Sequence, residues 1–312
     1  MLRVLPILLV LVGGVACDST AAPLDAQAIG DAGADAGPPC EPPADDPFAC
    51  EDLTPDPSCD AHWVVGATGH MITAAGDPVE SGRAQFCVRL APDDRLVCLF
   101  PPQTNAAGEF AIIVPEELRC LNRAAMRAIA PGQPLGTSYC PVEFEMGNAP
   151  IVELSDPYVL HPVEPAVVPP VGDEIAQRDV TFDGGLVLTL APVDFASSPD
   201  YEALAGAPVD VAATACFRGD LALNGAYVFS PEVVVEAGAA VSIPNADGLA
   251  AGSVVDLYVL GGLETRLLDG TMVEEGELAA IGPATVNADG SAILSDPDTR
   301  LPYLSWLVWR AR

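Results

Sequence analysis

The chain has 312 residues, of which 44 are acidic and 13 are basic, and its formal net charge is −31. All 13 basic residues are arginine, so the sequence lacks the lysine that P-loop phosphate binding, Schiff-base chemistry and lysine-activated serine catalysis require. The negative charge also argues against a nucleic-acid partner, because basic side chains supply the affinity for phosphates.

Residues 1–16 have the features of a secretory signal peptide. Arg3 supplies a positive charge, and an apolar run follows over residues 4–12, interrupted only by Pro6. This run is too short to span a bilayer. The sequence therefore predicts that the protein is exported.

The segment Gly14-Val15-Ala16-Cys17 resembles the lipobox of bacterial lipoproteins, in which the cysteine becomes the lipid-modified first residue of the mature chain. The resemblance implies that Cys17 is the lipid attachment site and that membrane lipid is a partner through the acylated N-terminus. Most such boxes carry leucine at the position of Gly14, and ordinary cleavage near Ala16 that leaves Cys17 unmodified is the alternative. We expect a lipid-anchored protein of the cell envelope, in the outer membrane of a Gram-negative bacterium.

Two segments separate this anchor from the first folded domain. Residues 17–39 consist mainly of Ala, Gly, Asp and Pro, and they have too few large apolar side chains to bury a core. We predict a disordered tether there. Residues 40–60 are acidic and proline-rich and contain three cysteines, which predicts a collar stapled by disulfides.

Antiparallel β structure is predicted from Trp63 onward, because short apolar runs alternate with Gly, Pro, Asp and Asn. We predict an all-β fold with two β-sandwich-like domains, over residues 61–153 and 175–312. A proline-rich linker over residues 154–174 joins them. Helical patterns are scarce, and residues 116–130 are the one segment predicted to form a short helix.

Eight cysteines follow Cys17, and an even number in an oxidising compartment favours disulfides. Segments 83–90 and 95–100 are predicted strands, and closing the turn at 91–94 as a hairpin places Cys87 opposite Cys98. We therefore predict a disulfide between these two residues.

The remaining cysteines are less constrained by the sequence. Cys120 and Cys140 bracket a loop, and we expect them to pair in the same way. Cys216 is the one cysteine after residue 175. It either bridges the two halves of the chain or is a buried free thiol.

The first β region resembles a carboxypeptidase regulatory-like domain, which is a transthyretin-like β-sandwich. The resemblance is carried by the turn Gly76-Asp77-Pro78-Val79, the strand through Phe86-Cys87-Val88, and the hairpin Thr104-Asn105-Ala106-Ala107-Gly108-Glu109-Phe110. In that hairpin Gly108 supplies a positive φ and Phe110 fills the core. The resemblance implies a non-catalytic spacer or binding unit. The sequence departs from the family in its extra cysteines and in the longer segment 116–150, which is an insertion or a binding loop.

The sequence motifs do not assemble an active site. The three histidines, His62, His70 and His161, are too isolated for a zinc site, and no G-x-S-x-G motif is present. We predict a non-enzymatic envelope protein without a metal or cofactor, acting as a structural module or binding a protein or glycan ligand at its surface. The alternative is an accessory domain of extracellular polymer processing that binds carbohydrate or peptide. Trp306 is the candidate contact for such a ligand, although a strand-end tryptophan more often completes a core.

Overall fold

The computed structural model of the protein describes residues 40–43, 45–144, 149–263 and 265–312. Within these residues the fold is all-β with β-sandwich-like domains, as the sequence predicts, and Pro42–Arg312 form one compact unit. No helix in the described part of the chain is long and apolar enough to cross a membrane. The signal peptide, the tether and Cys17 lie outside the described residues, so they stay predictions.

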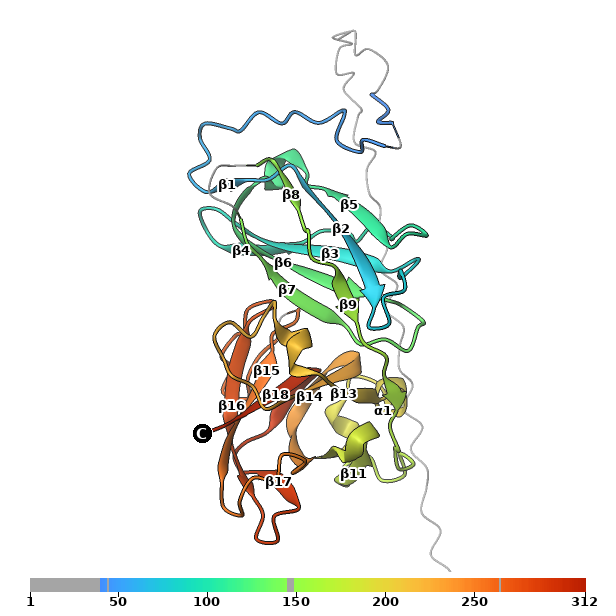
Figure 1. The fold of residues 1–312 in the computed structure, drawn as a ribbon, viewed down its shortest axis with the longest axis vertical. Coiled ribbons are helices and arrows are strands. Elements are labelled where there is room, and N and C mark those ends of the chain that lie inside the picture. The colour runs from blue at the N-terminus through green and yellow to red at the C-terminus, as the bar shows by residue number, and fades with distance from the viewer. Residues whose placement is uncertain (1–39, 44, 145–148, 264) are drawn as a thin grey trace, which may run out of the picture. The chain divides into compact units, whose positions relative to one another are not determined.

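The first domain consists of two sheets around a shared core (Figure 1). Its strands are β1 (His62–Trp63), β2 (Gly66–Thr73), β3 (Arg83–Leu90), β4 (Arg95–Cys98), β5 (Glu109–Ile113), β6 (Cys120–Ile129), β7 (Ser138–Val142), β8 (Ile151–Glu153) and β9 (Tyr158–Leu160). One sheet has the order β1-β6-β3-β4, and β7 also pairs with β6. The other has the order β5-β2-β8, and β9 also pairs with β2.

The turn motif of the first domain folds as its sequence predicts. Gly108 has a φ of 76°, and a Cβ there would lie 2.3 Å from the carbonyl oxygen of Met71. Glycine is therefore needed both for the backbone conformation and for the close approach. Phe110, which follows in β5, is 5% exposed and belongs to the core.

The predicted helix over residues 116–130 is wrong. Glu116–Leu118 form a single 3₁₀ turn, and Cys120–Ile129 form β6. β6 pairs antiparallel with β3, and this pairing buries Met126 and Ala128 on the core face. Apolar residues at helical spacing occur in this segment, but pairing with β3 buries a period-two pattern instead.

The second domain is formed by nine strands of one sheet. They are β10 (Glu164–Pro165), β11 (Arg178–Thr181), β12 (Val187–Leu190), β13 (Ala205–Val209), β14 (Gly225–Pro244), β15 (Val254–Leu260), β16 (Leu278–Val286), β17 (Ala292–Ser295) and β18 (Leu301–Ala311). The short helices are α1 (Ser198–Glu202) and 3₁₀ turns at Asp183–Gly185, Pro192–Asp194 and Val211–Thr214.

Five of these strands pair in a closed ring. β14 pairs with β17, β17 with β16, β16 with β15, β15 with β18, and β18 again with β14. The 20-residue β14 shifts register twice against β18, between Val228 and Val233 and between Val234 and Ala239. Such irregularities bend a strand, which lets β14 close the ring around the second core.

The proline-rich segment 154–174 belongs to the sheets of both domains. Its β9 pairs parallel with β2 of the first domain, and its β10 pairs antiparallel with β13 of the second. The chain between the domains is therefore tied by backbone hydrogen bonds at each end.

The structure shows the disulfide that the hairpin predicts. Cys87 lies opposite Cys98 in the register of β3 and β4, and their sulfur atoms are bonded. Cys40 and Cys50 in the collar are also disulfide-bonded.

The expected pair between Cys120 and Cys140 is wrong. Cys120 bonds to Cys59 in the collar, and Cys140 bonds to Cys216 in the second domain. The reason lies along β6, where Cys120 is opposite β1 while Cys140 is opposite Met126. Six residues of strand place these positions about 20 Å apart. Cys216 is therefore not a free thiol but bridges the two halves.

Candidate functional site

Three arginines lie on the outer face of the β1-β6-β3-β4 sheet. Arg123 and Arg127 alternate along β6 with the residues that face the core. Arg89 on β3 is directly opposite Arg123. Like charges at such a cross-strand position destabilise a sheet, so this face needs acidic partners from another part of the chain.

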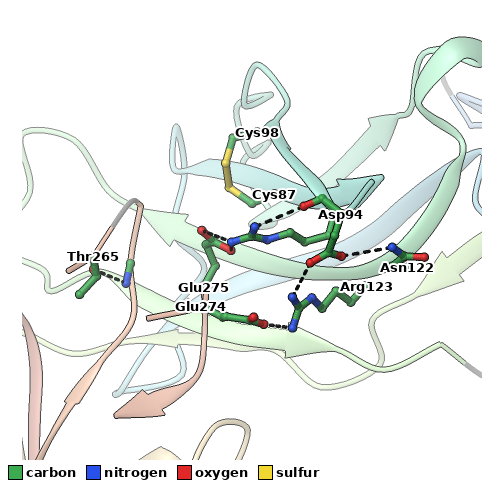
Figure 2. Close-up of polar contacts among 10 residues, drawn as sticks. Cys87, Asp94, Cys98, Asn122, Arg123, Thr265, Glu274 and Glu275 are labelled. Atoms are coloured by element: carbon green, nitrogen blue, oxygen red, sulfur yellow. Dashed lines mark hydrogen bonds and ion pairs between the residues drawn. A yellow bond between two sulfur atoms is a disulfide. The ribbon is translucent and has the colours of Figure 1, made fainter. Parts of the chain in front are cut away.

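The second domain supplies those partners from the connection between β15 and β16. Figure 2 shows Glu274 paired with Arg123, whose guanidinium also lies 2.6 Å from a carboxylate oxygen of Asp94. Beside this pair, Arg89 is 3.1 Å from Glu275. The side chain of Glu275 is only 4% exposed, so this pair is largely removed from water. The repulsion between the two arginines is thus balanced across the domain junction.

A second cluster at the junction surrounds Glu232 of β14, whose side chain is 3% exposed. Arg127 donates to Glu232 Oε2 through Nε at 3.0 Å and Nη2 at 2.7 Å. The hydroxyls of Tyr139 and Tyr303 both donate to Glu232 Oε1. Arg127 also donates to Gln85 Oε1 at 3.0 Å. One buried carboxylate therefore accepts hydrogen bonds from β6 and β7 of the first domain and from β18 of the second.

The protonation states of the residues around Glu232 favour the same hydrogen bonds. Burial, reinforced by the neighbouring Glu232 carboxylate, raises the pKa of the Tyr139 and Tyr303 hydroxyls well above its ordinary value. Both tyrosines therefore keep their protons and act as donors. Burial opposes the charge on Arg127, but the charge and hydrogen bonds of Glu232 and the neighbouring tyrosines together outweigh burial and raise the pKa of the guanidinium. The cluster is a satisfied network that joins two domains.

Glycines of both domains pack closely against the other domain around these clusters. A Cβ on Gly136 would lie 2.4 Å from Val228 Cγ2 on β14. Gly276 has a φ of 79°, and a Cβ there would lie 2.9 Å from the backbone nitrogen of Pro141. The Cys140–Cys216 disulfide adds a covalent bond between the domains at the same junction.

The burial of Trp306 contradicts the expectation that it contacts a ligand. Its side chain lies in an apolar cluster and is 1% exposed, and its indole N–H donates to the carbonyl oxygen of Thr137 at 2.7 Å. β18 lies between β14 and β15 in the sheet, so Trp306 is not at an edge. Trp306 of the second domain instead hydrogen-bonds to the first domain through Thr137.

A groove of about 1170 Å³ lies beside the junction. Its walls come from β7, from β8 and the turn that follows it, and from residues 212–216 of the second domain. Trp63 and Tyr158 line it, and so do the rings of His62 and Phe144, whose centroids are 4.7 Å apart. Burial raises the pKa of the Tyr158 hydroxyl above its ordinary value. A groove with aromatic rings and carboxylates can hold a small or extended ligand.

The residues that join the domains are ones that sequence reasoning missed. The signal for one half was present, because Arg123 and Arg127 share one face of any strand drawn through them. The acidic half carried no signal, since Glu232, Glu274 and Glu275 stand among 44 acidic residues.

Comparison with known proteins does not assign this chain to a family. No protein-family model matches the chain, and no curated protein matches its sequence. The lipobox and the carboxypeptidase regulatory-like pattern are therefore resemblances of sequence, and function is inferred from the residues themselves.

Proposed function

We propose that the protein is a non-enzymatic, lipid-anchored module of the cell envelope whose two β domains form a structural or ligand-binding surface. The observation that carries this proposal is the domain junction. Its guanidinium, carboxylate and hydroxyl groups bond one another across the two domains. Groups that are neutralised in this way hold an interface together rather than act on a substrate.

Charge supports a covalent anchor as the means of attachment. The formal net charge of −31 repels the protein from an anionic membrane surface, so electrostatics cannot hold it there. Acyl chains on Cys17 supply the attachment that the surface lacks. The predicted tether over residues 17–39 then holds the folded unit away from the lipid.

Replacement of the anchor residue tests this proposal. We expect Cys17→Ala to move the protein from the membrane fraction to the soluble fraction of fractionated cells. Ser19→Ala is the matched control, because it changes a neighbouring small residue and leaves the attachment site intact. Retention of the Cys17→Ala protein in the membrane fraction would overturn the anchor.

A second function is favoured by the groove beside the junction. Aromatic rings next to carboxylates are suited to an accessory module that binds carbohydrate or peptide during the processing of extracellular polymers. Binding of the purified protein to a glycan array would support the carbohydrate form of this function, and a blank array would count against it.

A further inference from the structure

The groove runs between two strands that have sheet partners on one side. Among the described residues, β7 pairs with β6 alone and β8 pairs with β2 alone. Residues of both strands line the groove. Strands with an unpaired side present backbone donors and acceptors to whatever lies beside them.

The hydrogen bonds of β8 show which of its backbone groups are available. The Pro150 carbonyl accepts from Gly66 N–H at 3.2 Å, and Leu154 N–H donates to the Thr68 carbonyl at 2.9 Å. Backbone groups alternate in direction along a strand. The N–H and C=O groups of Ile151 and Glu153 therefore point away from β2, on the side where β8 has no strand partner among the described residues. An extended peptide can pair with such groups, as in recognition by strand addition.

The charges of the groove are unbalanced, unlike those of the junction. Glu143, Glu153 and Asp156 line the groove, and within the described part of the chain none of them has an ion-pair partner. No arginine is among the groove residues. The carboxylates that meet the first domain at the junction, in contrast, each meet an arginine. The groove is complementary to a ligand that carries positive charge.

The aromatic side chains of the groove suit the same ligand. The neighbouring rings of His62 and Phe144, which are tilted by 31° to one another, offer an aromatic surface for a guanidinium or an aliphatic stem. Trp63 is 9% exposed, and its buried indole N–H has no hydrogen-bond partner among the described residues.

We propose that the groove binds a basic peptide segment of a partner protein in extended form, paired with β8 and held by Glu143, Glu153 and Asp156. This inference deepens the ligand-binding form of the proposed function. Two observations favour peptide over carbohydrate. The backbone groups of β8 that have no strand partner among the described residues match another backbone, and a neutral sugar would leave the three groove carboxylates without counter-charges.

The first test measures binding of a fluorescent peptide of alternating arginine and threonine to the full-length chain in non-ionic detergent, at physiological salt. Because any cationic peptide is attracted to a chain of net charge −31, the decisive quantity is a difference between variants of equal charge. The groove variant combines Glu143→Gln, Glu153→Gln and Asp156→Asn. The matched control combines Glu202→Gln, Glu236→Gln and Asp247→Asn, which are exposed residues outside the groove.

We expect the groove variant to bind the peptide about tenfold more weakly than the wild type, and the control variant to bind it as the wild type does. Equal weakening in both variants would overturn the proposal, since it would show attraction to overall charge. Equal binding of a peptide with glutamate in place of arginine would also overturn it.

The second test separates backbone pairing from charge. Methylation of alternate amide nitrogens in the peptide keeps its charge but removes donors, and we expect it to weaken binding to the wild type. On the protein side, Glu153→Pro removes an N–H that points away from β2, and Glu153→Gln is its matched control. Undiminished binding of the methylated peptide would overturn strand pairing.

A carbohydrate probe completes the test. A chitin oligosaccharide that bound in a groove-dependent way, with no groove-dependent binding of the basic peptide, would overturn the peptide proposal. These measurements do not depend on lipid attachment, so failure here is distinguishable from failure of the Cys17→Ala experiment.

Discussion

The two β domains differ in how their sheets end. The first keeps two separate sheets, so β7 and β8 each have one paired side within the described residues. The second closes five strands into a ring, because β14 pairs with both β17 and β18. The second domain also covers the charged outer face of the first. The closed domain is therefore suited to support the open one, and the open one to receive a ligand.

The largest expected difference between the domains is in amide hydrogen exchange. The N–H groups of Ile151 and Glu153 face away from β2, whereas Tyr227 and Val228 lie in β14 between β13 and β18. We expect the two β8 amides to exchange at least roughly a thousandfold faster than those of β14, since exposed edges open with little cost. Exchange measured by NMR would decide this. Equal protection would show that β8 is covered in solution.

This comparison also shows how far the sequence predicts the structure. The Cys87–Cys98 hairpin follows from a turn and two adjacent strands, so local pattern was enough to predict its register. The local pattern of β6 favours a helix, but its pairing with β3, and not its own propensity, decides its conformation. The contacts at the junction cannot be predicted from local sequence pattern, since Arg127 and Glu232 are separated by 105 residues. Pairing at that distance depends on the topology of both domains.

Removal of the disulfides tests how much the second domain stabilises the first. Cys140–Cys216 closes a separation of 76 residues across the junction, and Cys87–Cys98 closes 11 within one hairpin. Loop-closure entropy predicts that paired Cys→Ser substitutions cost about 4.5 kcal/mol for the first bond and about 3 kcal/mol for the second. Urea unfolding without reductant measures both. A larger loss from the hairpin bond would contradict the prediction.

Removal of the buried Glu232 carboxylate at the junction gives the next largest loss of stability. Glu232→Ala leaves the Arg127 guanidinium and two tyrosine hydroxyls without their acceptor in a buried site, so we expect a loss of about 3–5 kcal/mol. Asp256→Ala is the matched control, because Asp256 also pairs with arginines, whose side chains are 38% and 55% exposed. An exposed pair contributes about 0–1 kcal/mol. Similar losses in the two variants would show that the Glu232 cluster does not join the domains.

The smallest effect concerns the pH dependence of the junction. His161 lies between β9 and β10, with its ring edge-on to Trp306 at 5.7 Å between centroids, and burial lowers its pKa. An unfolded histidine has a pKa of about 6.5. Between that value and the lower folded pKa, the unfolded chain binds more protons than the folded chain. The contribution of His161 to the free energy of unfolding is therefore full above about pH 6.5 and is lost as the pH falls through the folded pKa.

We expect His161→Gln to flatten this part of the curve of unfolding free energy against pH, measured by urea unfolding at a series of pH values. An unchanged slope in the variant would mean that the histidine is not buried against Trp306 in solution, and that this part of the junction is looser than its neighbouring ion pairs.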